Sequence, residues 1–523
     1  MDAVLERQLQ KGWDSACKVL FGQEMGALSD YSGYLSEWNM KSARAKSSIS
    51  GKEVTLVSTD YPKSARFASA DEIRLNKDYA LSINQIKDLD SLLSALSDKC
   101  EYAGNKHLGN NMLVESSDVV TDSQYVFGST NVEKSACVYE SFMIRKDTKY
   151  AFGSGWLAKG EFVLRCIGAH TIKRCFESHY AVKSSDLYYC HSVVGCHDMM
   201  FSFGQRSASY KIGNLALPKD KYKEIKAKLV SEMAERLQKD KTLPLLFELA
   251  DGAPAATLPK ISPIEPKDEK NVGTVRKGFA STYGIILRRA PQHALEDYGG
   301  WLSDKSISVE PCTTQYGRKT TRAKDFTWMR IIPKQRLVSI FELLEIGKHP
   351  MPEKAARSLE SMFSHMKGNL FATCEFYDGE NSNVNETPCT YGAVGTYRAF
   401  DATDAENVAY TSIALNTKFV YGGNWLLESE FCINCSYSNH LTRCLEMDFC
   451  TKCSDSYFCH NCEGLSDCMF CFNMKGARYC IGNTQLTREE YMLARDALLK
   501  KMADELDATR GLKMSIYSIG AKR

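Results

Sequence analysis

Cysteines recur at strict intervals toward the end of the chain. One row places a cysteine every nine residues, and a second row runs three residues ahead of it, with Leu441 and Ala477 in its remaining places. The first row is Cys435, Cys444, Cys453, Cys462, Cys471 and Cys480, and the second is Cys432, Cys450, Cys459 and Cys468. All lie on one three-residue grid, which is typical of repeats that bury inward residues by stacking. The spacing predicts a β-solenoid.

The same stretch occurs twice in the sequence. Residues 149–214 align without a gap with residues 418–483, and 26 of the 66 positions are identical. Trp156 matches Trp425, and residues 27–36 resemble residues 294–303. The whole chain is therefore predicted to be a tandem duplication, with two like copies related by a pseudo-twofold axis.

A second period appears before the cysteines. Valine or isoleucine recurs every six residues from Val120 to Ile144, with serines midway between them. Six and nine both divide 18, so we expect a coil of about 18 residues in which every third side chain points inward. Cys435, Cys453 and Cys471 would then form one column, and Cys444, Cys462 and Cys480 another.

The predicted fold class is mainly β with flanking helices (α+β): a duplicated β-solenoid capped by a C-terminal amphipathic helix. In the second capping helix, Thr487 and Glu490 have the spacing of a capping box. The first copy is assigned to 1–242, with a mixed α/β lobe 1–110, a solenoid 111–216 and a capping helix 217–242. A proline-rich linker 243–273 leads to the second copy 274–523, with a lobe 274–380, a cysteine-rich solenoid 381–485 and a capping helix 486–510.

Composition narrows the class of protein. The chain has 523 residues, with 66 basic and 64 acidic side chains and a pI near 7.7, which argues against general coating of nucleic acid or membranes. The sequence has no signal-peptide pattern and no apolar run long enough to span a bilayer. We expect a cytoplasmic protein with no membrane partner. In a reducing compartment the twenty cysteines are packed or metal-bound more often than joined in disulfides.

The paired cysteines have two interpretations. CxxC pairs can bind zinc, so possible ligands are Cys432, Cys435, Cys450, Cys453, Cys459, Cys462, Cys468 and Cys471. In the first copy, however, the equivalent places hold residues such as Val163, Ala181 and Met199. A position that accepts these residues needs a compact apolar group, which free cysteine supplies. We favour packing, with no cofactor, and keep structural zinc in the second copy as the alternative.

Polar residues shared by both copies do not match a known catalytic pattern. His191/His460, Asp186/Asp455, Asp198/Asp467 and Glu177/Glu446 could form acid–base sets, but turns of a solenoid also favour such residues. The sequence has no phosphate-binding loop, HExxH motif or nucleophile elbow. We therefore predict no enzymatic activity, no catalytic residues and no small-molecule substrate.

One row of outward residues suggests a binding face. Its basic and aromatic members share one phase of the nine-residue repeat, and such residues can hold a nucleic-acid backbone and stack on bases. The row is Arg165, Arg174, Lys183, Arg443, Lys452, Phe470 and Tyr479. A solvated face or a protein contact is the ordinary alternative.

The end of the second copy carries a recognisable pattern. Cys468-Met469-Phe470-Cys471-Phe472-Asn473 is followed by Tyr479-Cys480-Ile481-Gly482-Asn483. It resembles uncharacterised cysteine-rich repeat proteins of archaea and candidate-phylum bacteria that end in a YCI-x-N block, and the run Asp122-Ser123-Gln124-Tyr125-Val126-Phe127-Gly128-Ser129 resembles their serine–valine repeats. The resemblance implies the solenoid architecture for about half of the chain and brings no established activity.

Three function classes follow from these observations. The first is a non-catalytic scaffold or binding protein that presents rigid solenoid faces to a large macromolecular partner or to copies of itself. The second is a zinc-containing factor associated with RNA or the ribosome, of a regulatory or hibernation type. The third is an enzyme, which a deep pocket joining residues of both copies would favour over the prediction of no activity. A structural component of a virion is a further alternative.

Overall fold

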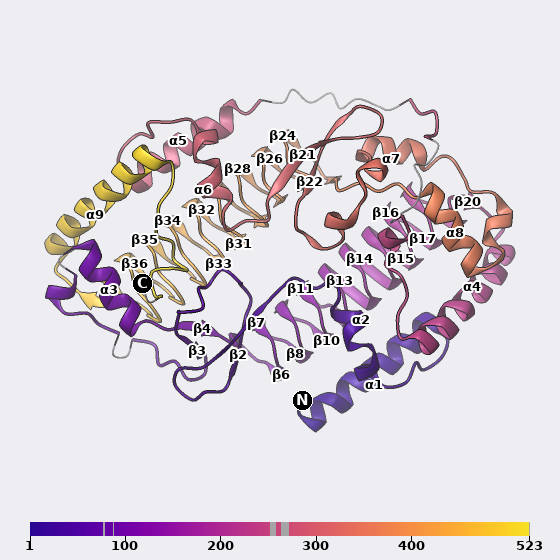
Figure 1. Cartoon of the computed structure of the whole chain (residues 1–523), viewed down its shortest axis with the longest axis horizontal. Coiled ribbons are helices and arrows are strands. Elements are labelled where there is room, and N and C mark those ends of the chain that lie inside the picture. Colours follow the sequence, from indigo (N-terminus) through magenta and orange to yellow (C-terminus); the bar gives the residue numbers. More distant parts are fainter. Residues whose placement is uncertain (77–78, 87, 251–257, 263–270, 522–523) are drawn as a thin grey trace.

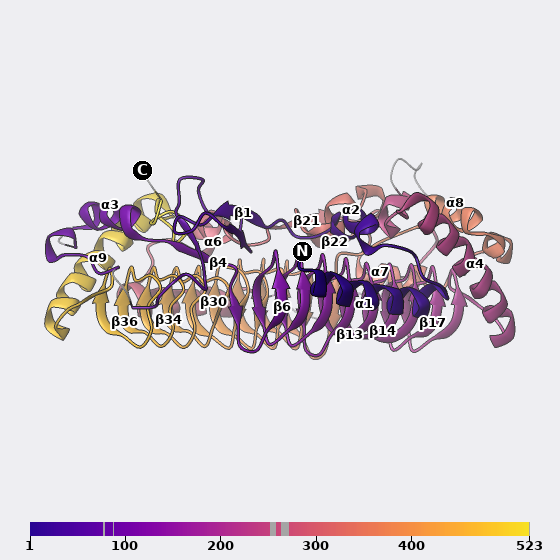
Figure 2. The same ribbon diagram turned by 90° about the horizontal axis from the view of Figure 1, so that it is seen from below.

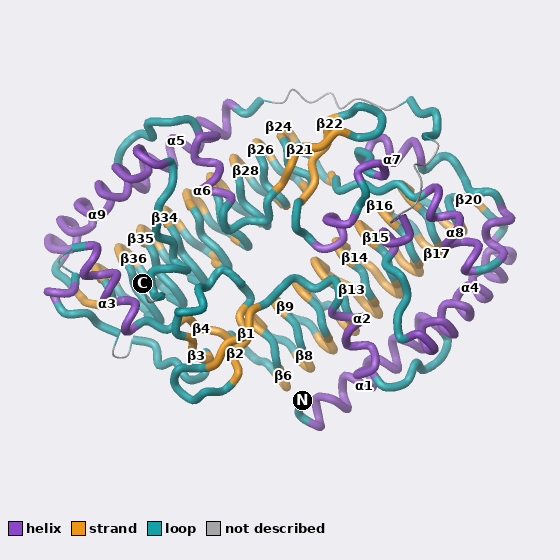
Figure 3. The backbone as a smooth tube through the Cα atoms, in the orientation of Figure 1, coloured by secondary structure: helices purple, strands orange, loops and turns teal. Residues whose placement is uncertain are grey.

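The fold is mixed α/β, with long sheets of parallel strands flanked by helices. The computed structural model describes residues 1–76, 79–86, 88–250, 258–262 and 271–521. Two stacks of parallel strands run away from the middle of the molecule in opposite directions (Figure 1). The first stack extends from β5 (His107–Leu108) to β20 (Leu215–Ala216), and the second from β23 (Phe376–Asp378) to β38 (Thr484–Gln485) (Figure 3).

Strands pair with the same register in both stacks. Gly155 pairs with Ile167 and Ile167 pairs with His179, so each residue lies beside the residue 12 positions ahead. Cys432 and Cys444 of the second stack pair at the same interval. We call each 12-residue unit a rung, and neighbouring rungs are separated by the usual strand spacing of about 4.8 Å.

This register corrects the predicted coil of about 18 residues. With 12 residues per rung, Cys435 and Cys453 cannot lie in one column, whereas Cys432 and Cys444 do. A step of nine residues is three residues, or one side, shorter than a full rung of 12. Each step along the nine-residue row therefore moves to the next rung and back by one corner, so the row winds around the interior. The six-residue period is half a rung.

The three-residue grid describes each rung correctly. A rung has four sides, and each side consists of an outward residue, a residue with positive φ and an inward residue. In one rung the sides are 161–163, 164–166, 167–169 and 170–172, and we number the sides of all rungs in this order. Arg165 has φ of 54° at such a corner. A non-glycine residue costs on the order of 1 kcal/mol there, which the hydrogen bonds between rungs must offset.

The interiors of the two stacks are filled differently. The first contains mainly Val, Ile, Leu and Ala, and the second contains Ala, Leu and half of the chain's twenty cysteines. Serines share the first interior: Ser129 donates to the carbonyl of Phe127 at 2.8 Å and accepts from the N–H of Ser141 at 3.1 Å. Inward serine hydroxyl groups of the first stack therefore have partners in the adjacent backbone.

Both halves have a similar order of elements, which differs mainly within the lobes. The first half has α1 (Ala3–Phe21), α2 (Ser32–Ser36), the antiparallel pair β1 (Ala43–Lys46) and β2 (Glu53–Leu56), β3 (Phe67–Ser69), α3 (Leu89–Lys99), β4 (Tyr102–Gly104), the first stack and α4 (Lys219–Asp240). The second has α5 (Gly273–Leu287), α6 (Gly299–Ser303), the antiparallel pair β21 (Val309–Thr313) and β22 (Lys319–Ala323), α7 (Ile340–Ile346), α8 (Leu359–Asn369), the second stack and α9 (Arg488–Thr509).

Helices α1 and α5 cover the stacks of their own halves. Asp2 caps α1 by accepting from the backbone N–H groups of Val4 and Leu5. The buried face of α1 includes Leu9 and Trp13, which belong to one cluster with aromatic residues of the first stack. The α5 residues belong to the corresponding cluster on the second stack.

The two lobes are exchanged between the halves. The first lobe, residues 43–104, packs on the second stack, where the Leu81 N–H donates to the carbonyl of Gly482 at 3.1 Å. The second lobe, residues 309–373, packs on the first stack, where Met351 N–H donates to the carbonyl of Gly213 at 2.9 Å. The domain bounds predicted from the sequence group each lobe with the stack that follows it in the chain. In space it lies on the other stack, in a layer over the row of rungs (Figure 2).

The capping helices lie at the outer ends of the stacks (Figure 1). The bounds of α4 and α9 lie inside the predicted ranges 217–242 and 486–510, and the predicted capping box of Thr487 and Glu490 is confirmed. The predicted linker begins with a buried turn, η3 (Leu246–Ala250), and most of its remainder lies outside the described residues. Among the described residues, no helix combines the length and apolar character needed to cross a membrane.

Candidate functional site

The cysteines that were considered as zinc ligands lie inside the second stack. All eight are at most 3% exposed. Their thiols point at backbone carbonyls of their own rung and the next: Cys450 Sγ is 3.4 Å from the carbonyl oxygen of Asp448 and 3.3 Å from that of Cys459. Cys453 and Cys462 repeat this arrangement. The thiols therefore have hydrogen-bond partners within the protein.

The protonation of these thiols is unfavourable for metal binding. Burial raises the pKa of Cys459 to about 11 and that of Cys462 to about 12, whereas zinc binds the thiolate. No group of three or more His, Cys, Asp or Glu side chains among the described residues could hold a metal ion. The neutral, hydrogen-bonded donor set does not fit zinc, and zinc in the second copy stays a prediction for metal analysis to test.

The predicted basic and aromatic row does not form one face. Arg165 is 2% exposed and Phe470 is 0% exposed. A nine-residue step changes the side of the rung, so residues in that phase face different directions. Lys183 and Lys452 are exposed on the fourth side, while Tyr479 lies on the first side against Tyr491 of α9.

The two remaining arginines of that row are paired with carboxylates one rung ahead. Arg174 donates to Asp186 at 2.8 and 2.6 Å, and Arg443 donates to Asp455 at 2.7 and 2.6 Å. Both pairs are bidentate and lie on the first side. The aspartates that sequence analysis singled out therefore neutralise a basic neighbour.

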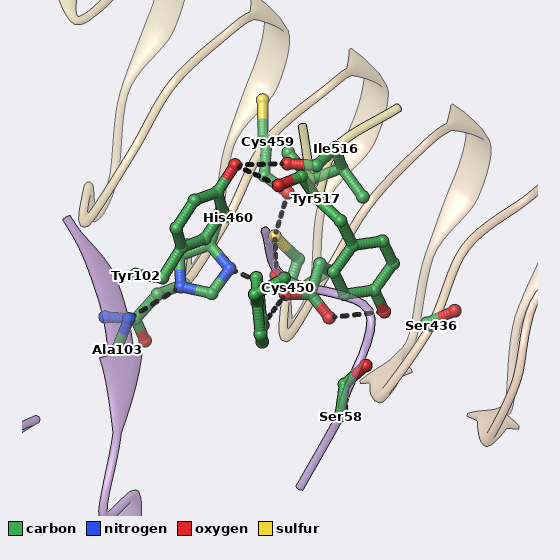
Figure 4. A network of polar contacts seen from close by, with 12 residues as sticks. Ser58, Tyr102, Ala103, Ser436, Cys450, Cys459, His460, Ile516 and Tyr517 are labelled. Atoms are coloured by element: carbon green, nitrogen blue, oxygen red, sulfur yellow. Dashed lines mark hydrogen bonds and ion pairs between the residues drawn. The ribbon is translucent and has the colours of Figure 1, made fainter. Parts of the chain in front are cut away.

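A histidine marks each place where an exchanged lobe meets a stack. The backbone N–H of Ala103, in β4 of the first lobe, donates to Nε2 of His460 at 2.9 Å (Figure 4). In the other half, the N–H of Thr373 donates to Nε2 of His191 at 3.2 Å. These two histidines occupy equivalent positions of the duplication, so both lobes dock with the same contact.

Asp448 completes the docking site on the second stack. Its carboxylate lies 2.7 Å from Nδ1 of His460 and accepts from the hydroxyl groups of Tyr61 at 2.6 Å and Tyr517 at 3.1 Å. Although burial opposes it, the hydrogen bonds from His460 and Tyr61 lower the pKa of Asp448, while burial lowers that of His460. A neutral imidazole that donates from Nδ1 and accepts at Nε2 satisfies every one of these contacts.

This geometry leaves His460 without a free nitrogen. A general base must reach a substrate proton, but Nδ1 of His460 faces Asp448 and Nε2 accepts from Ala103. The ring is 0% exposed. The other shared acids are also engaged: Glu446 accepts from the N–H of Ile516 at 2.9 Å. The contacts on these side chains are those of a joint between protein segments.

The docking site on the first stack has different chemistry. His179 replaces Asp448, and Arg165 forms a buried ion pair with Glu177, the equivalent of Glu446. Burial lowers the pKa of His191 to about 3. Within the described residues, Nδ1 of His179 and Nδ1 of His191 have no hydrogen-bond partner. The buried polar atoms of the docking site on the second stack therefore have more of their hydrogen-bond partners than those on the first stack.

An exposed basic column was missed by sequence analysis. Lys134, Lys146, Lys159 and Lys183 occupy the fourth-side corner of the first stack and are exposed, and Thr171 fills the remaining rung. Their spacing is 12, 13, 12 and 12 residues, because one rung has an additional residue. A search at a 12-residue period that allows one insertion would have found the column.

Comparison with protein-family models, with curated proteins and with solved structures found no match for this chain.

Proposed function

We propose that this protein is a non-catalytic scaffold, built from two β-solenoids that are locked together by exchanged lobes. The reciprocal docking of the lobes carries this proposal. Each stack has its third side covered by the lobe of the other half, so separating the stacks would require both docking sites to open. A rigid body with long exposed sides is suited to holding a large partner or further copies of itself in a fixed orientation.

The contacts at the docking sites also favour a structural role. His460 and His191 bind backbone N–H groups of the exchanged lobes. Trp156 of the first stack donates to Asp401 of the second at 2.9 Å, and the Arg145 guanidinium lies over the ring of Trp425. Contacts of this kind hold the two halves in one orientation, which is what a scaffold requires.

The proposal is tested by lysine cross-linking and mass spectrometry on the protein at natural abundance in native lysate. We expect it to sediment well above its own mass of 58.7 kDa. Cross-links to partners should fall on exposed lysines of the first side, such as Lys149, Lys173 and Lys418, and of the fourth side, such as Lys183. A monomer in lysate, or partner cross-links confined to the lobes, would contradict the scaffold role.

The zinc-containing, RNA- or ribosome-associated factor is the alternative proposal. Co-sedimentation with ribosomes, together with stoichiometric zinc in protein purified without added metal, would favour it. Recovery within virus particles would instead favour the virion component. These outcomes are distinct in the same fractionation experiment.

A further inference from the structure

The fourth side of the first stack carries four exposed lysines on five successive rungs, with Thr171 on the remaining rung. Arg145, Ala158, His170 and Val182 are register partners on successive rungs, and the corner residue after each is Lys146, Lys159, Thr171 or Lys183. Lys134 precedes them by one rung. Four rung steps of about 4.8 Å place the column along roughly 19 Å of the surface.

The column is open to solvent and weakly neutralised. Lys146, Lys159 and Lys183 form no ion pair among the described residues, and Lys134 approaches only Glu133, at 4.0 Å. Asp147 is the other nearby acid and is also exposed. By contrast, two first-side lysines pair with acids one rung away: Lys173 with Glu161 at 3.1 Å and Lys418 with Glu406 at 3.3 Å.

The pKa of His170 is sensitive to the positive charge of this column. It is exposed on the same side, and its pKa is lowered by partial burial and by nearby cations. The cations are Lys146, Lys159, Arg145 and Lys183. Four positive charges acting on one ring indicate that their potentials overlap instead of being cancelled locally.

The second stack does not carry this charge at the equivalent corners. Asp404, Asn416, Glu428 and His440 stand where the first stack has Lys134, Lys146, Lys159 and Thr171, and only Lys452 matches Lys183. Glu428 also pairs with His440 at 3.0 Å. Rung geometry is the same on both stacks, so the lysine column is not required for folding.

The chemistry of the column points to a repeating anion. The core of a protein interface usually has apolar and aromatic anchors, but the apolar residues of these fourth sides, Ala158 and Val182, are buried. Proteins that bind single strands add aromatic platforms for base stacking, and the column contains no aromatic residue. Lysine ammonium groups in a straight row instead suit phosphates, which position a nucleic acid without reading its sequence.

We propose that the fourth side of the first stack binds the phosphate backbone of double-stranded nucleic acid. At one phosphate per about 3.4 Å of helix axis for each strand, a 19 Å column spans roughly five or six phosphates of one strand. Contacts from about three or four lysines predict a slope near −3 in a plot of log affinity against log salt concentration. This proposal adds a partner class to the scaffold, and its failure would leave the cross-linking test of the scaffold unaffected.

The test measures binding of 20-base-pair DNA and RNA duplexes to the full chain by fluorescence anisotropy between 50 and 200 mM salt. The triple variant K146Q/K159Q/K183Q should lose at least tenfold in affinity and most of the salt slope. Lys159→Glu alone should weaken binding severalfold, and it should fold normally because Glu428 occupies the equivalent corner. Equal effects on DNA and RNA would indicate backbone recognition, and a preference would identify which duplex fits the surface.

The matched control is K418Q/K452Q/K475Q, which removes the same charge from exposed positions of the second stack. It should change affinity less than about twofold. The proposal is wrong if wild-type protein binds neither duplex at 50 mM salt, or if both triple variants lose affinity equally. It is also wrong if a poly-glutamate competitor displaces the duplex while single-stranded and duplex forms bind alike, since that outcome would indicate a general polyanion surface.

Discussion

The two stacks share one rung geometry but differ in much of what fills their interiors and covers their sides. The first has valine and serine inside, a lysine column on its fourth side and an Arg165–Glu177 pair at its docking site. The second has cysteines inside, a mixed fourth side and the Asp448–His460 pair. The comparison shows that the backbone register tolerates any compact inward group, so the exposed sides and the docking sites were free to change separately.

The docking sites should show the largest difference. Replacing Asp448 with alanine leaves the Nδ1–H of buried His460 and two tyrosine hydroxyl groups without their acceptor. At about 1–3 kcal/mol for each unsatisfied buried donor, we expect a loss of about 3–5 kcal/mol in unfolding free energy. His179→Ala, at the equivalent position, removes a ring whose Nδ1 has no partner, and should cost about 1–3 kcal/mol. Urea unfolding of both variants measures the contrast, and equal losses would show that the Asp448 network adds no more than packing.

Alkaline pH should expose the difference between the interiors. Unfolded thiols ionise near pH 8.5, whereas burial raises the folded pKa of Cys462 to about 12. A raised folded pKa contributes stability that is complete below pH 8.5 and is lost as pH rises toward 12. For this thiol the loss is about 2 kcal/mol at pH 10.

Cys462→Val should recover that loss, because the first stack carries Val193 at the same place. We therefore expect the variant to match wild type within about 1 kcal/mol at pH 7 and to exceed it at pH 10, both measured by urea unfolding under reducing conditions. Identical pH profiles would indicate that Cys462 is already accessible to ionisation in the folded state.

Inward serine and cysteine should be nearly interchangeable. Loss of the sulfur in Cys453→Ala should cost about 1–2 kcal/mol. A buried hydroxyl normally adds a penalty, but Ser184 of the first stack occupies the equivalent position and donates to the carbonyl of Val182 at 2.7 Å. Cys453→Ser should therefore cost no more than Cys453→Ala in thermal or urea unfolding. If serine is clearly worse, the carbonyl geometry at the second stack differs from that at the first.

The sequence predicted the duplication, the inward three-residue grid and the capping helices because these depend on local spacing. It missed the 12-residue rung, since the cysteine row advances by nine and is visible only as a diagonal across rungs. It also missed the lobe exchange. Ala103 and His460 lie 357 positions apart, and no periodicity links them. The Asp448–His460 contact follows from the 12-residue register, which the 18-residue interpretation concealed.

The smallest expected effect concerns a feature that both stacks keep. Arg443 and Asp455 form a bidentate pair, as do Arg174 and Asp186, and the arginines are about equally exposed, at 42% and 43%. A partly exposed pair of this kind should have a coupling energy of about 0.3–1 kcal/mol. Double-mutant cycles with alanine measure it on each stack. All four residues have positive φ, but the backbone cost of each substitution cancels in the cycle. We expect the two couplings to agree within about 0.5 kcal/mol and to shrink at 1 M salt. A coupling above about 2 kcal/mol on one stack only would mean that the first sides of the two stacks differ in solvation. The stacks would then share their backbone geometry but not the energetics of this pair.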